Sequence, residues 1–208
     1  MREASSTPAL LIIDVQQGFD DPVWGPRNNP HAESEIARLL EAWRAARGPI
    51  FHIRHDSGEL QSPLRPGQPG NQIKAEARPL AGEPVIGKSV NSAFIGTDLE
   101  ARLRRHGVDA VVIAGITTNH CVSTSARMAG NLGFATYVVA NATATFDRAA
   151  LDGSIRSAEE VHAAALSDLN DEFAIILSSD EAISKLKDHQ DSSQPNPADA
   201  LEREGSRL

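Results

Sequence analysis

Short apolar runs alternate along the chain with segments whose apolar positions recur at helical spacing. The run at 9–13 is apolar throughout and predicts a buried strand, whereas 33–47 places its apolar residues on one face of a helix. Strands that alternate with helices favour a three-layer α-β-α fold, Rossmann-like, with a six-stranded parallel sheet. The further strands are predicted at 50–53, 84–87, 109–114, 135–140 and 172–177, and the further helices near 96–106, 119–132, 156–169 and 179–187.

Two segments depart from this alternation. Residues 54–83 are polar and rich in Pro and Gly, and a loop of that length in a compact domain is usually functional or disordered. Residues 189–208 are polar and interrupted by Pro195 and Pro197, which predicts a tail that is disordered unless a partner holds it. We therefore expect one domain over 1–188, followed by the tail 189–208.

Composition and charge restrict the class of protein. Hydrophobic residues make up 40% of the 208 positions, yet no apolar run approaches the length of a membrane span. The first residues lack the apolar core of a secretory signal, and a single cysteine fits a reducing compartment, so we expect a cytoplasmic protein. A net charge of −8 argues against nucleic acid as a partner, because phosphate binding requires a basic surface.

Cys121 is the only cysteine, and it follows the predicted strand 109–114 at the start of a predicted helix. The unpaired N–H groups and the positive end of a helix dipole lower the pKa of a thiol at this place. A lone cysteine is more often a small buried hydrophobe. Its position at a strand end nevertheless makes it a candidate nucleophile.

Asp14 and Lys88 stand at comparable places, directly after the strand at 9–13 and at the end of the strand at 84–87. Taken singly, an Asp after a strand is often a turn residue and a Lys is usually a solvated charge. Parallel α/β sheets, however, build their sites at the carboxyl ends of the strands. An acid, a base and a thiol at three such ends predict a convergent site.

This combination resembles the isochorismatase-like cysteine hydrolases, over roughly the first four-fifths of the chain. The resemblance implies catalytic roles for Asp14 as general base, Lys88 as its charge partner and Cys121 as nucleophile. It also implies an oxyanion hole made of the backbone N–H groups of Thr117 and Cys121, beside a cis peptide bond between Ile116 and Thr117. The segments that carry the resemblance are 11–19, 87–94, 114–122 and 142–147.

The activity that the resemblance implies is hydrolysis of a small molecule, with a thioester intermediate. The segments 54–57 and 62–64 are most similar to metal-free amidohydrolases such as the streptothricin hydrolases, which indicates a C–N amide or cyclic amide (lactam) as substrate. An isochorismatase acting on a vinyl ether is the alternative, although that reaction needs no thiol. An inactive binding scaffold is a third reading. Residues expected by position to bind substrate are Phe19, Trp24, Asn91, Phe94, Asn119 and His120.

Neither a metal nor a cofactor is expected. The related nicotinamidases carry an Asp-x-His-Pro metal motif after the second strand, whereas this chain has His-Ile-Arg-His-Asp at 52–56. Residues 82–89 match the phosphate-loop pattern G-x-x-x-x-G-K-[ST], but here a strand lies between the two glycines, so the loop cannot wrap a phosphate.

A homodimer or tetramer is expected, because members of the resembled superfamily are commonly closed oligomers whose neighbouring subunit contributes to the pocket. Leu60, Leu64 and Ile73 of the long loop would then be buried against another subunit. A monomer with a mobile lid is the alternative.

Overall fold

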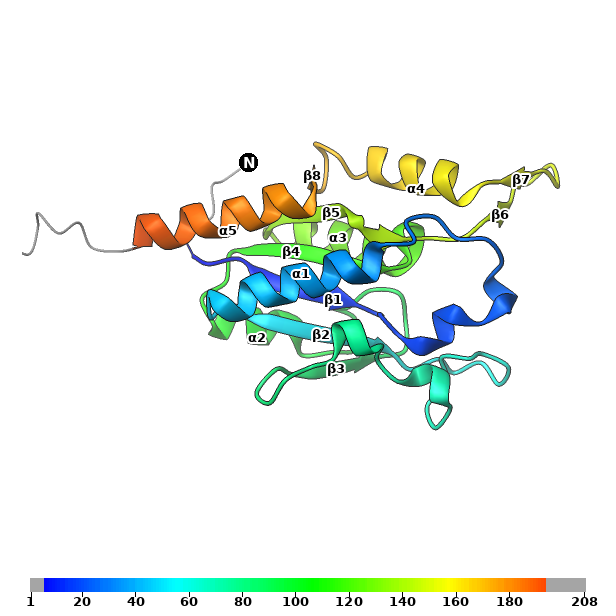
Figure 1. Cartoon of the computed structure of the whole chain (residues 1–208), viewed down its shortest axis with the longest axis horizontal. Helices are drawn as coiled ribbons and strands as arrows, with labels where there is room; N and C mark the ends of the chain where they lie inside the picture. Colours follow the sequence, from blue (N-terminus) through cyan, green and yellow to red (C-terminus); the bar gives the residue numbers. More distant parts are fainter. Residues whose placement is uncertain (1–5, 194–208) are drawn as a thin grey trace, which may run out of the picture.

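The computed structural model describes residues 6–193, and its centre is a parallel sheet of six strands (Figure 1). The strand order is β3-β2-β1-β4-β5-β8, and every neighbouring pair is parallel. The predicted fold class is thus confirmed. The strands are β1 (Ala9–Ile13), β2 (Ile50–His55), β3 (Val85–Lys88), β4 (Ala110–Ile116), β5 (Ala135–Ala144) and β8 (Ile175–Leu177).

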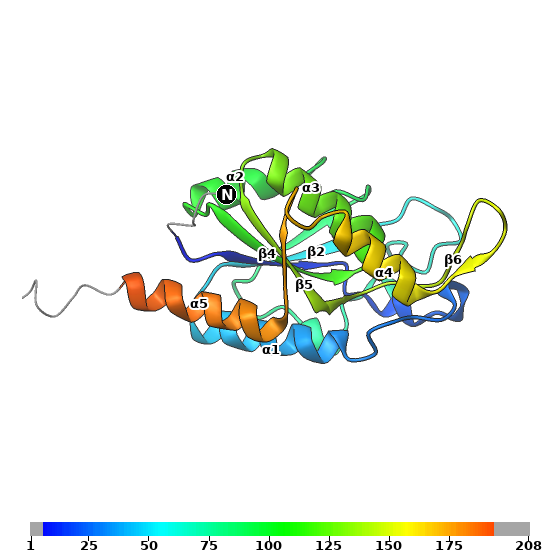
Figure 2. The same cartoon turned by 90° about the horizontal axis from the view of Figure 1, so that it is seen from above.

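Helices cover both faces of this sheet (Figure 2). Helices α1 (Ala32–Ala45) and α5 (Ser179–Ser193) lie side by side on one face, where Leu39 and Trp43 join the apolar side chains of the strands. Helices α2 (Leu99–Arg105), α3 (Ser123–Asn131) and α4 (Ala158–Ser167) contribute to the core on the other face. The central strand β1 is buried at all five positions because it is covered on both sides.

Several boundaries differ from those predicted. Strand β5 continues four residues past 140, to Ala144, and carries the chain directly to the pocket. Helix α5 continues past 187 to Ser193, since nothing in its sequence breaks a helix before Pro195. The rest of the expected tail, 194–208, lies outside the described residues. The sequence also missed a short hairpin, β6 (Arg148–Ala149) and β7 (Ile155–Arg156), which is too brief to show a period.

The long loop after β2 is ordered by hydrogen bonds to its own chain. Buried Gln16 donates to the carbonyl oxygens of His55 and Asn71 (3.0 Å each), and Asn71 Nδ2 donates to Leu64 O (2.8 Å). Leu64 is 4% exposed and packs beside Phe19, so it is not free to contact a second subunit.

This packing corrects the argument for an oligomer. Ile73 packs against the core of its own chain, as Leu64 does, and only Leu60 is largely exposed, at 73%. Two of the three residues expected at a subunit contact are therefore used internally. The oligomeric state itself stays a prediction.

No helix within residues 6–193 is both long and apolar enough to cross a membrane.

Candidate active site

Asp14, Lys88 and Cys121 meet at the carboxyl ends of β1, β3 and β4. Lys88 Nζ donates to Asp14 Oδ2 over 2.6 Å and to Cys121 Sγ over 3.4 Å. The side chains of Asp14 and Lys88 are completely buried, and Cys121 is 8% exposed. The predicted convergence of the three residues is confirmed, and Lys88 is not a solvated charge.

The backbone at these strand ends is specialised. Asp14 has φ 51°, in the left-handed region that Asp tolerates better than most residues. Gly115 has φ 138°, and a Cβ there would lie 2.0 Å from Ile13 O, so only glycine allows β4 to approach β1 so closely. The peptide bond between Ile116 and Thr117, just beyond Gly115, is cis, as the resemblance implied.

A π-helical turn (Thr118–Val122) then leads into α3 and carries the thiol. Val122 N donates to Thr117 O over 3.2 Å, which closes the turn around Cys121. Thr118 Oγ1 lies 2.9 Å from Nδ1 of the buried His162, so α4 also holds the turn. The thiol is therefore fixed by the residues on both sides of it rather than by the helix alone.

His55 is a further polar neighbour of the three residues. It ends β2 and pairs in register with Lys88, and its Nδ1 lies 3.2 Å from Lys88 Nζ. Burial, together with the Lys88 charge, lowers the pKa of His55, so the ring is neutral at pH 7 and Nδ1 accepts from the ammonium. The strand-end position that singled out Asp14 and Lys88 also applied to His55.

The acidities of Asp14 and Cys121 are set mainly by burial. Burial raises the pKa of Asp14, although Lys88 opposes the change. Burial and the neighbouring Asp14 charge raise the pKa of Cys121 to about 12, again against the effect of Lys88. The expected lowering of the thiol pKa is therefore wrong, because loss of solvation outweighs the favourable charge beside the sulfur.

This raised pKa predicts how the free thiol responds to pH. The fraction of thiolate is small at pH 7 and grows tenfold for each pH unit below the pKa. Alkylation of Cys121 by iodoacetamide should therefore accelerate continuously from pH 7 to pH 10. Because Cys121 is the only cysteine, intact-mass measurement follows the reaction directly. A rate that is already constant above pH 7 would show that the thiol is ionised in the free protein.

A cavity of about 680 Å³ opens onto the thiol, a size suited to a small molecule. Asp14, Thr117 and Cys121 line it, as do five of the six residues expected to bind substrate: Phe19, Trp24, Asn91, Asn119 and His120. Phe94 is the exception, because it stacks on Phe134 at 6.2 Å and packs against the core instead. The binding roles themselves stay predictions.

One wall of the cavity is aromatic. Phe19 lies 5.3 Å from Trp24 and 6.1 Å from Phe146, and Trp24 lies 5.9 Å from Phe146, between ring centroids. We call these three rings the aromatic wall. Phe146 was not expected there, although it lies only two residues past the end of β5. Arg148 and Asp147 add charges at the same end of the cavity.

The cluster also has the donor atoms of a metal site, but a cation already stands among them. A carboxylate oxygen of Asp14, a ring nitrogen of His55 and Sγ of Cys121 lie within 4.8 Å of one another. Lys88 Nζ contacts all three residues. A divalent ion would have to displace this ammonium group, so the donors do not fit a resident metal while Lys88 is charged.

Comparison with known proteins gives a consistent family. The model of the isochorismatase domain matches residues 8–181. The protein YrdC of Bacillus subtilis, an isochorismatase family protein, is 44% identical over 182 residues, which cover 87% of this chain and 97% of YrdC. A crystal structure from the same family, from Chromobacterium violaceum, is 49% identical, covers 90% of this chain and 97% of that one, and superposes with a TM-score of 0.86.

More distant relatives include a nicotinamidase and a streptothricin hydrolase. Nicotinamidase 3 of Arabidopsis thaliana is 30% identical, over 85% of this chain and 87% of its own. Streptothricin hydrolase of Streptomyces noursei is 31% identical, over 67% of this chain and 50% of its own. The match to the domain model spans both the sheet and the three strand ends that hold Asp14, Lys88 and Cys121. The chain is therefore a hydrolase of the isochorismatase family.

Proposed function

We propose that the chain is a cysteine-dependent hydrolase of small-molecule C–N amide or cyclic amide (lactam) bonds. The observation that carries the proposal is the contact of one buried ammonium, Lys88 Nζ, with both a carboxylate and a thiol at the floor of a cavity. An acid–base group beside a sulfur nucleophile is what covalent acyl transfer requires. The nicotinamidase and a maleamate amidohydrolase among the relatives support the same class of reaction.

The first half of the reaction forms a thioester. Asp14 takes the proton of the Cys121 thiol while the sulfur attacks the substrate carbonyl. The raised pKa of Asp14 makes this carboxylate a stronger base than an exposed one. The difference between its pKa and that of the Cys121 thiol is therefore smaller, which makes the proton transfer easier. Lys88 stabilises the negative charge as it moves from Asp14 to sulfur, because its Nζ contacts both groups. The C–N bond then breaks, and Asp14 returns the proton to the leaving nitrogen.

The second half hydrolyses the thioester. Asp14, again ionised, takes a proton from a water molecule that attacks the acyl carbon, and the thiol leaves with that proton. Asp14 Oδ1 is buried and has no hydrogen-bond donor among residues 6–193, so it is available for each of these transfers. The backbone N–H groups of Thr117 and Cys121 stabilise the oxyanion of both tetrahedral intermediates.

A vinyl ether hydrolase of the isochorismatase type is the alternative activity. Protonation of a vinyl ether followed by addition of water needs an acid but no sulfur nucleophile. The contact between the thiol and Lys88 favours the amide reaction, because vinyl ether hydrolysis would give this contact no catalytic role. An inactive binding scaffold is disfavoured for the same reason.

Detection of the acyl-enzyme tests the proposal. The protein is incubated with a panel of primary amides, anilides and lactams, quenched in acid, and examined by intact-mass and peptide mass spectrometry. The expected result is an adduct of acyl mass on Cys121 that hydroxylamine removes. Turnover of an amide without any such adduct, including under rapid quench and with slow substrates, would contradict the thioester mechanism.

Hydrolysis is expected to be independent of metal, because Lys88 supplies the positive charge at the place where a cation would stand. Rates measured before and after exhaustive dialysis against a chelator should agree within about twofold, since a catalytic metal contributes several orders of magnitude. Loss of activity on chelation that zinc or iron restores would overturn this prediction.

A further inference from the structure

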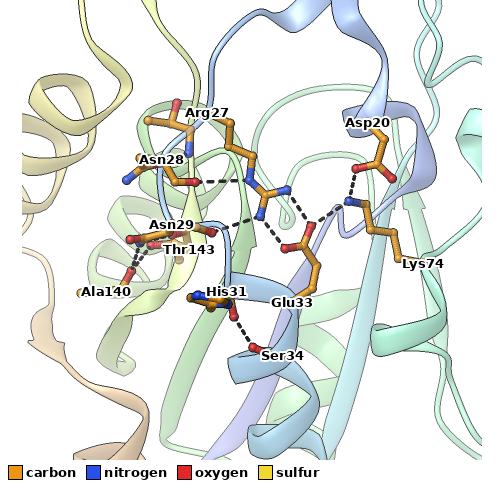
Figure 3. A network of polar contacts seen from close by, with 11 residues as sticks. Asp20, Arg27, Asn28, Asn29, His31, Glu33, Ser34, Lys74, Ala140 and Thr143 are labelled. Carbon is orange, nitrogen blue, oxygen red and sulfur yellow. Dashed lines mark hydrogen bonds and ion pairs between the residues drawn. The ribbon is translucent and has the colours of Figure 1, made fainter.

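Four charged side chains form a network that joins the segment 17–31 to the start of α1 and to Lys74 (Figure 3). Lys74 Nζ donates to Asp20 Oδ1 and to Glu33 Oε1, over 2.5 and 2.7 Å. Arg27 donates to both carboxylate oxygens of Glu33. Glu33 is thus the shared acceptor of two cations. We call Asp20, Arg27, Glu33 and Lys74 the charge network.

The members of the charge network other than Asp20 are largely buried. The side chains of Lys74, Glu33 and Arg27 are 9%, 12% and 17% exposed. Burial alone would raise the pKa of Glu33, but the hydrogen bonds and charges of Arg27 and Lys74 outweigh it and lower the pKa to about 2. Glu33 is therefore ionised at any working pH, and removing it would leave two buried cations without their common partner.

Through Asp20, the charge network contacts the short turn that carries Phe19. Asp20 is the next residue and belongs to the same 3-10 turn (Gln17–Asp20). Phe19 lines the catalytic cavity, whereas Asp20 lines a separate pocket and accepts from Lys74. Lys74 is itself fixed, because its backbone N–H donates to Val15 O over 2.9 Å. The ion pair thus connects the residue next to Phe19 to a fixed point beside β1.

Through Arg27, the charge network also contacts Phe146. The backbone of Arg27 forms an antiparallel bridge with Phe146. Asn28 and Thr145 continue it with two hydrogen bonds, Asn28 N to Thr145 O (3.2 Å) and Thr145 N to Asn28 Oδ1 (2.7 Å). Thr145 Oγ1 in turn donates to Asn119 Oδ1, which lines the cavity (2.6 Å). Glu33 therefore contacts both Lys74, which binds the residue next to Phe19, and Arg27, whose backbone pairs with Phe146.

We propose that Glu33 is a positioning residue that sets the spacing of the aromatic wall, and thereby selects substrates with a flat apolar group next to the scissile amide. The assignment rests on the proposed function in that the cavity takes the substrate, but not on turnover. Neither Glu33 nor Lys74 lines the catalytic cavity, so their effect on selection passes through Phe19 and Phe146. A carboxylate that only stabilised the fold would affect small and aromatic ligands alike.

Two alkylating probes separate these roles without requiring hydrolysis. Iodoacetamide and N-phenyl iodoacetamide both react at Cys121, the only cysteine, but only the second carries a ring. The quantity measured is the ratio of their second-order rate constants, divided by the same ratio for glutathione, which corrects for intrinsic reactivity. In the wild type this corrected ratio should be about 5 or larger, the order expected when one ring stacks on the aromatic wall.

Glu33→Gln should lower the corrected ratio about fivefold while the iodoacetamide rate changes less than about twofold. Glu35→Gln is the matched control, because Glu35 lies in the same first turn of α1 but pairs with Arg38 and Ser179. It should leave the ratio unchanged. Lys74→Met should repeat the effect of Glu33→Gln, and Lys74→Arg, which keeps the charge, should restore most of the preference. If Glu33→Gln does not fold, the comparison of Lys74→Met with Lys74→Arg still tests the proposal.

Three results would overturn the proposal. The first is a wild-type ratio near 1, because the wall would then select nothing. The second is an unchanged ratio in a folded Glu33→Gln protein. The third is an equal fall of both rates, which would assign Glu33 to the fold or to the thiol. If no amide is hydrolysed but the ratio responds as expected, the proposed reaction fails while the role of Glu33 stands.

Discussion

Cys121→Ala is expected to lower amide hydrolysis by about three orders of magnitude or more, because the reaction loses its nucleophile. The fold should persist. The side chain removed is small and belongs to the same buried cluster as Val122 and Ala126, so loss of its buried sulfur should cost about 1 kcal/mol of unfolding free energy. The measurement is kcat/KM on whichever amide forms an adduct with the wild type, together with the thermal unfolding midpoint.

Ser123→Ala is the matched control for this substitution. Ser123 lies two residues further along the chain as the first residue of α3, is similarly buried at 8% exposure, and is not among the residues lining the catalytic cavity. It should retain activity within about threefold, as expected of a substitution outside the reacting groups. A Cys121→Ala protein that hydrolyses amides at the wild-type rate would contradict the covalent mechanism. Loss of amide hydrolysis with retained vinyl ether hydrolysis would favour the alternative activity.

The convergence could be predicted from the sequence because Asp14 directly follows β1 and Lys88 ends β3, while Cys121 lies in the turn that connects β4 to α3. In a parallel sheet, the place of a residue along its strand gives its place in the molecule, so Asp14 and Lys88 were located without tertiary information. Sequence position becomes a poorer guide to position in the molecule a few residues beyond the end of a strand. Phe94 lies in the loop after β3, and the loop turns its ring to Phe134 rather than into the cavity.

The thiol pKa was mispredicted because it depends on solvation, which the sequence does not give. The helix-start argument correctly identified favourable charge beside Cys121. It could not show that Asp14 and the thiol are buried together, nor that burial has the larger effect. The same limit applies to His55, because its place in the sequence does not show that its ring is buried beside Lys88.

The charge network was not predicted either, because its members come from separate parts of the chain. Lys74 reaches Glu33 only because residues 15–17 pair with 72–74, a pairing between two stretches without regular period. Each of the four side chains, taken singly, looks like an ordinary surface charge. Only the burial of Glu33 and Lys74 distinguishes them.

Asp14→Asn is expected to reduce amide hydrolysis by about 10²–10⁴-fold, the range typical for loss of a general base. The same substitution should make the free thiol more reactive. The Asp14 charge is one of the causes that raise the pKa of Cys121, whereas Lys88 lowers it. With an amide in place of the carboxylate, Lys88 faces the thiolate alone, so the thiol pKa falls. Alkylation by iodoacetamide at pH 8 should therefore become faster than in the wild type.

Lys88→Met should also abolish hydrolysis, but it should slow alkylation. The pKa values of both Cys121 and Asp14 rise further without the ammonium, so each group stays protonated to higher pH. Removing one member of a fully buried ion pair also costs about 3–5 kcal/mol, so the double variant Asp14→Asn with Lys88→Met serves as a control that restores neutrality.

Turnover and alkylation together then separate electrostatics from simple damage to the site. Both single variants lose hydrolysis, yet the thiol becomes more reactive in one and less reactive in the other. A distorted or opened cavity would change alkylation in the same direction in both, through access rather than charge. Rates are compared from pH 7 to pH 10 in each variant, after near-identical circular dichroism spectra show that all are folded. If alkylation slows in Asp14→Asn as much as in Lys88→Met, the carboxylate does not oppose the thiolate. Such slowing would overturn this prediction, because it would mean that Asp14 assists the free thiol as a proton acceptor more than its charge opposes the thiolate.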